Sequence, residues 1–94
     1  MSLFCLIECT KSKTDCFEMA RYVLAARQCY ECSAGTTNDA LLMIRPSCTS
    51  NNDDATMLRA EMIVPGQLQL TCVYGNLGIF NNLCHAIGTK LRTK

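Results

Sequence analysis

The stretch that decides the fold runs from residue 56 to residue 91 and reads TMLRAEMIVPGQLQLTCVYGNLGIFNNLCHAIGTKL. Two segments of alternating apolar and polar side chains, 56–64 and 67–74, flank the turn dipeptide Pro65-Gly66. Proline presets φ at the first corner of a turn, and glycine tolerates the positive φ of the second. The pattern therefore predicts a β-hairpin. Its predicted core-facing residues are Leu58, Ala60, Met62, Val64, Leu68, Leu70, Cys72 and Tyr74.

A helix is predicted directly after this hairpin. Gly75-Asn76 closes the second strand, and apolar residues then recur at helical spacing. Such a stripe is typical of a helix that packs one face against a core. The stripe consists of Phe80, Leu83, Cys84, Ile87 and Leu91.

The first 27 residues predict a strand followed by a second helix. Residues 2–9 are apolar on both faces, with Phe4 and Leu6 on one of them. This indicates a central strand or a sheet whose second face is also covered. Ser12 with Asp15 three positions later resembles a capping box, so a helix is expected from about residue 12 to Arg27.

The middle of the chain supplies the remaining strands. Residues 29–33 are short and β-like, whereas 40–45 is apolar through Ile44 and is expected in the sheet interior. Residues 47–54 are polar and predict a loop. The order β-α-β-β-β-β-α predicts an α+β two-layer sandwich, with two helices on one face of a largely antiparallel sheet of four or five strands. This arrangement approaches a ferredoxin-like or roadblock-like sandwich within a single domain, 1–94.

Length and charge restrict the classes of function. The chain has 94 residues, 49% of them hydrophobic, and a formal net charge of +1. This composition favours one compact domain and supplies no basic field for a nucleic-acid partner. The start of the chain has no basic segment before its apolar run, and no apolar run reaches the ~18 residues of a membrane span. A cytoplasmic or other intracellular protein with no nucleic-acid or membrane partner is therefore expected.

Eight cysteines in 94 residues are many for an intracellular protein. A disulfide scaffold, a metal site and buried thiols are the three interpretations of such a set. Cys5 and Cys9 are four residues apart on one predicted strand, about 13 Å between Cα atoms, so they cannot bond to each other. The cysteines lie at core positions of predicted strands and helices, which favours buried thiols that act as small apolar side chains.

One cysteine pair has the spacing of a metal site. Cys29 and Cys32 form the only CxxC motif, which can chelate zinc or act as a redox pair. A closed zinc site needs further ligands, and Cys48 is the first candidate. A zinc-stabilised accessory or regulatory binding domain is therefore one alternative function, with zinc as its cofactor.

No residue is predicted to be catalytic. Cys84 and His85 are adjacent, but neighbouring residues on a helix diverge by about 100° and cannot form a Cys–His dyad. Paired carboxylates, a phosphate-binding glycine loop and a serine elbow are absent from the sequence. A small thiol-dependent enzyme that uses one of the eight cysteines remains a second alternative.

Association with another protein is the function that the sequence favours. Apolar residues are expected on both faces of the sheet, including Leu42, and on a second stripe of the first helix. Apolar area held outside a core often marks an interface. The predicted module associates with itself or with a partner protein, and its candidate interface residues are Phe4, Leu6, Met19, Tyr22, Ile63 and Val73.

Overall fold

The structure is a computed structural model that describes residues 3–26, 30–35, 39–45, 47 and 52–92. Among these residues no helix combines the length and the apolar character needed to cross a membrane. The elements are, in chain order, β1 (Phe4–Glu8), α1 (Lys13–Ala25), β2 (Tyr30–Gly35), β3 (Asp39–Ile44), the 3-10 turn η1 (Asn52–Asp54), β4 (Thr56–Val64), β5 (Gln67–Tyr74) and α2 (Leu77–Arg92).

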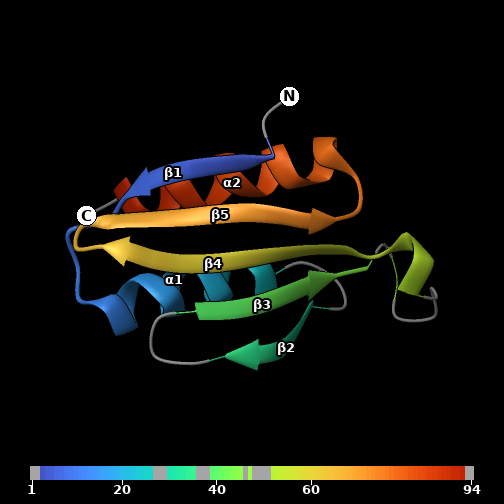
Figure 1. Cartoon of the computed structure of the whole chain (residues 1–94), viewed down its shortest axis with the longest axis horizontal. Helices are drawn as coiled ribbons and strands as arrows, with labels where there is room; N and C mark the ends of the chain where they lie inside the picture. The colour runs from blue at the N-terminus through green and yellow to red at the C-terminus, as the bar shows by residue number, and fades with distance from the viewer. Residues whose placement is uncertain (1–2, 27–29, 36–38, 46, 48–51, 93–94) are drawn as a thin grey trace.

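The five strands form one sheet in the order β1-β5-β4-β3-β2, and each neighbouring pair is antiparallel. Strands β2 to β5 follow one another as a meander, while α1 carries the chain from β1 at one edge to β2 at the other (Figure 1). Both helices lie behind the sheet in this view. The predicted α+β sandwich with two helices on one face is confirmed.

The core lies between the sheet and the two helices. The stripe predicted for α2 is confirmed, because all of its residues are buried. The core face that helical spacing predicts for α1 is also buried, and it consists of Cys16, Phe17, Ala20, Val23 and Leu24. Each large apolar side chain that is fully buried stabilises the fold by about 1.5–3 kcal/mol before conformational entropy is subtracted. The largest such side chains are Phe80, Leu24, Leu42, Leu58, Leu68, Leu70 and Ile87.

The first strand departs from its predicted position. A central position is one of the two interpretations of its apolar faces, and this interpretation is wrong, because β1 is an edge strand that pairs only with β5. Phe4 and Leu6 lie on the face opposite the helices and are half exposed. Leu42 was expected to contribute to the outer apolar surface, but it is 1% exposed and belongs to the core on the helix side. An alternating pattern fixes which residues share a face, but not which face is covered.

Two predicted core residues of the hairpin point away from the core. Val64 and Tyr74 are both largely exposed. The register of β4 with β5 shifts between Glu61 and Val64, and again between Met57 and Leu58 opposite Tyr74. An irregularity that adds a residue to one strand reverses the alternation beyond it. The simple two-residue period therefore fails at both ends of this strand pair.

The junction between β5 and α2 packs closely against the start of β4. Gly75 has φ +114°, and a Cβ atom built on it would lie 2.6 Å from the Thr56 Cα and 2.8 Å from the Ala55 carbonyl oxygen. The Asn76 amide donates to the Thr56 hydroxyl over 3.3 Å, and the Asn76 side-chain oxygen accepts from the Ile79 amide over 3.0 Å. The junction thus caps α2 and fixes its direction.

We predict that Gly75→Ala lowers the free energy of unfolding by about 3 kcal/mol, because the new methyl group meets backbone atoms at a positive φ. Gly66→Ala is the matched control: Gly66 also has positive φ, +82°, but the nearest atom to an added Cβ is 4.0 Å away. Its expected cost is about 1 kcal/mol of left-handed strain. Urea unfolding of the two variants tests this, and equal costs would contradict the close packing.

Candidate functional site

Two disulfides attach β1 and the residues after it to both helices. Cys5 on β1 bonds to Cys84 on α2, with Cα atoms 6.5 Å apart, and Cys9 bonds to Cys16 on α1, with Cα atoms 6.2 Å apart. The prediction of buried thiols is therefore wrong for these four cysteines. Cys5 and Cys9 do not bond to each other, as expected, because each faces a different helix. The sequence alone does not show that α2 lies beneath β1, so it does not reveal the Cys84 partner.

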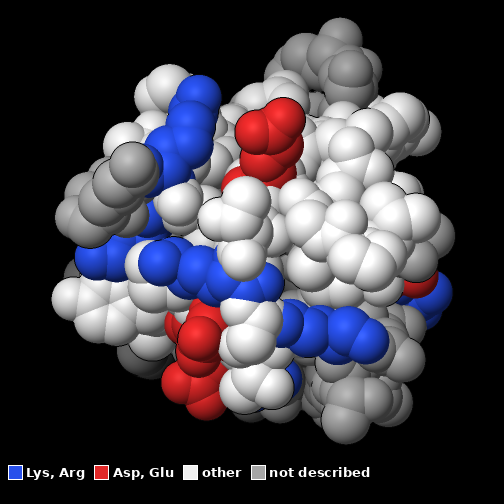
Figure 2. All heavy atoms as spheres, turned by 90° about the vertical axis from the view of Figure 1, so that its left-hand side faces the viewer, with Lys and Arg blue, Asp and Glu red and all other residues white. Residues whose placement is uncertain are grey.

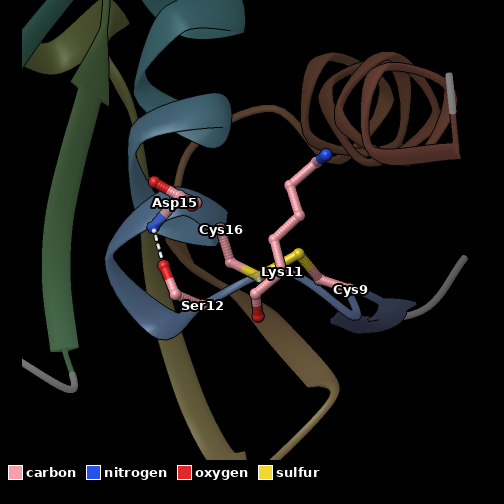
Figure 3. Close-up of a disulfide and its surroundings, with 5 residues drawn as sticks. All are labelled: Cys9, Lys11, Ser12, Asp15 and Cys16. Carbon is pink, nitrogen blue, oxygen red and sulfur yellow. Dashed lines mark hydrogen bonds between the residues drawn. A yellow bond between two sulfur atoms is a disulfide. The ribbon is translucent and has the colours of Figure 1, made fainter. Parts of the chain in front are cut away.

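The Cys9–Cys16 bond lies at the start of α1 (Figure 3). The Ser12 hydroxyl oxygen accepts from the Asp15 amide over 3.1 Å, so Ser12 is the N-cap that the sequence predicts. The side chain of Lys11 extends from this turn toward α2. A cap and a covalent bond together fix the point where the chain leaves the sheet and enters the first helix.

The predicted zinc ligands lie in the part of the chain that is not described. Cys29 and Cys48 are outside the described residues, and Cys32 belongs to β2, where the side chain is not described. Among the histidines, cysteines and carboxylates that are described, no group of three or more could hold a metal ion. The zinc-stabilised alternative therefore stays a prediction that rests on the CxxC spacing.

The thiols available for chemistry are restricted. Among the cysteines whose side chains are described, Cys72 on β5 is the free one, and it packs against the core. Burial raises the pKa of the Cys72 thiol because the charged thiolate loses hydration. His85 is exposed on α2, and its neighbour Cys84 is already in a disulfide. These observations weigh against Cys72 as an activated nucleophile and against a Cys84–His85 pair.

An apolar patch lies on the outer face at the β1 edge of the sheet. Phe4 is 51%, Leu6 52% and Val73 48% exposed, and we call these three residues the edge patch. Phe4 stands opposite Thr71 and Leu6 opposite Gln69 on β5. Polar residues therefore separate the edge patch from the centre of the sheet, where Arg59 and Glu61 continue the same rows.

The other predicted interface residues are distributed differently. Met19 is partly buried and packs against the core, whereas Tyr22 is 65% exposed. The Lys90 ammonium group lies 5.0 Å from the centre of the Tyr22 ring, so α2 supplies a cation–π contact to α1. Ile63 belongs to β4, but its side chain is not described. The structure therefore groups Phe4, Leu6 and Val73, and places Met19 and Tyr22 on the helix layer.

A groove lies between β1 and α2, along the edge of β1 that does not pair with β5. The sequence does not indicate this groove. It has a volume of about 380 Å³. One wall is the strand itself, from Cys5 to Glu8, and the other is one side of α2 with Cys84, His85, Gly88 and Arg92. Positions 84, 88 and 92 recur at intervals of four residues on one side of a helix, but only the contact of α2 with β1 shows that this side meets a sheet edge.

Charges of both signs are mixed at the end of the molecule where the β4–β5 turn lies. Figure 2 shows lysine and arginine side chains there with acidic side chains between them. Lys11 and Lys90 line one hollow together with Asp15 and Glu18. A phosphate backbone is bound by a surface of one sign, so this face gives no support to a nucleic-acid site.

We predict that removing the Cys5–Cys84 disulfide destabilises the protein more than removing Cys9–Cys16. The chain-entropy model gives about 4.5 kcal/mol for a bond that joins residues 79 apart and about 2.4 kcal/mol for one that joins residues 7 apart. Urea unfolding of Cys5→Ala/Cys84→Ala and Cys9→Ala/Cys16→Ala measures both costs. Peptide mapping without reductant comes first, because finding these four cysteines as free thiols would contradict the pairing.

We predict that alkylation of Cys72 in the folded protein follows a pH profile shifted upward from that of an unstructured peptide, because the thiolate is the reactive form. The raised pKa also makes stability depend on pH. The buried neutral thiol contributes fully to stability at pH values below the pKa of Cys72 in the unfolded chain, and this contribution is lost as the pH rises through the higher pKa of Cys72 in the folded protein. Iodoacetamide labelling at several pH values, read out on the Cys72 peptide by mass spectrometry, measures the shift. Coincident profiles would contradict it.

The edge patch, the groove beside it and the disulfide between β1 and α2 occupy one region of the molecule and constitute the candidate functional site. An apolar patch beside a shallow groove at a sheet edge suits binding of a polypeptide rather than chemistry on a small substrate. No protein-family model and no curated protein matches the chain.

Proposed function

We propose that this protein is a small association module that binds a second polypeptide, a further copy of itself or a different partner, through the edge patch. The observation that carries the proposal is the exposure of Phe4 and Leu6, each about half accessible, on a strand attached to α2 through Cys5 and Cys84. Large apolar side chains of this kind normally lie in a core. Here the backbone that presents them is fixed by a covalent bond.

The surroundings of the edge patch support binding rather than incidental exposure. An interface commonly has an apolar centre and a polar rim. Thr71 and Gln69 border the edge patch on β5, and Glu8 follows it on β1. The patch is small, so association through it alone is expected to be weak or transient. A binding platform that is already ordered loses little conformational entropy on association.

The disulfides also bear on where such a module works. Disulfides form and persist in oxidising environments and are rare in the cytosol. The two disulfides support folding in an oxidising compartment, and they weigh against the intracellular location that the sequence predicts. We therefore propose association between proteins in such a compartment.

We predict that the wild-type protein self-associates with rising concentration and that Phe4→Thr/Leu6→Thr remains monomeric. Threonine retains strand propensity while it removes the apolar surface. Light scattering from micromolar to millimolar concentration measures the mass. Val64→Thr is the matched control, because Val64 is 47% exposed but lies outside the edge patch.

A wild-type protein that stays monomeric throughout this range contradicts the self-association version. Association with a different partner is then tested with a photo-cross-linking residue in place of Thr71, next to the edge patch, or in place of Asn82, on the exposed side of α2. Equal capture at the two positions would contradict the proposed role of the edge patch.

A further inference from the structure

The outer edge of β1 presents a row of backbone hydrogen-bonding groups. The Leu3 carbonyl accepts from the Cys72 amide over 2.7 Å, and the Cys9 amide donates to the Gly66 carbonyl over 2.9 Å. Backbone groups of an antiparallel strand alternate between its two sides, so the odd-numbered residues of β1 face β5. The amide and carbonyl groups of Phe4, Leu6 and Glu8 therefore point away from the sheet, and no described strand pairs with them.

A glycine of α2 lines the groove beside this edge. Gly88 lies in the interior of α2, where glycine is less favourable than alanine. A Cβ atom at this position would only make ordinary contacts, 3.5 Å to a terminal guanidinium nitrogen of Arg92 and 4.0 Å to Ile7. Packing within the fold does not require glycine here. Alanine would stabilise the helix better at this position, whereas glycine leaves more room in the groove.

The two sides of the edge differ in chemistry. On the outer face, a strand placed beside β1 meets Phe4 and Leu6, with the exposed Glu8 at the end of the same row. On the helix side it meets His85 and Arg92, which line the groove. The Arg92 Nε atom donates to the Gly88 carbonyl over 3.0 Å, so the position of the guanidinium group beside the edge is set by its own helix. Successive side chains of a strand point to opposite faces, so apolar and acidic residues in alternation complement this edge.

The position of α2 determines what can lie there. Cys5 is bonded to Cys84 and Ile7 lies near Gly88, so the helix runs beneath β1 (Figure 1). Paired strands are about 4.8 Å apart, whereas packed helices need 8–10 Å between their axes. If the β1 strands of two copies paired symmetrically, the two α2 helices beneath them would lie closer together than packed helices allow. The edge therefore accommodates an extended segment with no helix behind it, which excludes β1 of a second copy.

We propose that the β1 edge binds an extended segment of a partner protein by strand addition. The segment hydrogen-bonds to the backbone of Phe4, Leu6 and Glu8, places apolar side chains against the edge patch, and directs acidic side chains toward Arg92 and His85. This inference rests on the proposed association function and specifies its mode and its partner. Main-chain hydrogen bonds supply affinity in such complexes, and alternate side chains supply specificity.

The test uses a fluorescent peptide of the sequence Thr-Val-Glu-Val-Glu-Val-Thr, about long enough to span β1, with the full-length, disulfide-bonded protein. Fluorescence anisotropy is expected to show binding at least about tenfold tighter than that of the same peptide with lysine in place of glutamate. Arg92→Gln should reduce this preference several-fold. Equal affinity for the two peptides would overturn the assignment of an acidic partner.

Leu6→Pro tests the backbone contacts. The Leu6 amide faces away from β5, so proline removes only an outward donor and is tolerated on an edge strand. We expect at least about a tenfold loss of affinity for Leu6→Pro, and less than about threefold for Leu6→Val, which keeps the amide and an apolar side chain. Undiminished binding by Leu6→Pro would overturn strand addition.

A second measurement does not depend on the folding of a variant. Two versions of the peptide are titrated against the wild-type protein, one N-methylated at the odd-numbered residues and one at the even-numbered residues. Only the version whose methylated amides face β1 is expected to lose binding. Equal affinity of both versions overturns strand addition, as does the absence of binding by every peptide at millimolar concentration. Neither outcome bears on the edge patch itself, which the light-scattering and cross-linking measurements test separately.

Discussion

The attachment of β1 to both helices is the constraint on which the rest of the structure depends. β1 has five residues, one neighbouring strand and two half-exposed apolar side chains, so noncovalent contacts hold it less firmly than the central strands. Cys5 bonds to α2, and Cys9, just beyond the strand, bonds to α1. These bonds fix the edge of the sheet against the helix layer, and they thereby define the groove and the orientation of the edge patch.

Much of the fold follows from patterns that are local in the sequence. The hairpin, the two helix stripes and the Ser12 cap depend on spacing within a single element, so the residues alone predict them. The exposure of Val64 and Tyr74 depends on register irregularities between strands, which a two-residue period does not contain. The edge position of β1 depends on its partner in the sheet, because apolar residues on both faces suit a buried strand and a binding strand equally.

The candidate site was predictable only in part. The alternating pattern predicts the exposure of Phe4, Leu6 and Val73, because side chains that do not face the core must point to the other face of the sheet. The Cys5–Cys84 bond and the groove arise where α2 passes beneath β1, a contact between residues 79 apart in the chain. No local pattern of residues encodes such a contact. Met19 looked similar to Tyr22 in the sequence, yet it packs against the core while Tyr22 lies under Lys90.

The Cys5–Cys84 bond also determines how the protein responds to mechanical load. It links a residue near the start of the chain to one in the last helix, so the segment between them is closed into a covalent loop. A pulling force applied at the two termini passes through the sulfur atoms and bypasses the sheet. The strands of the meander then bear no tension, and while this bond is intact only residues outside the loop, such as the last turns of α2, can extend.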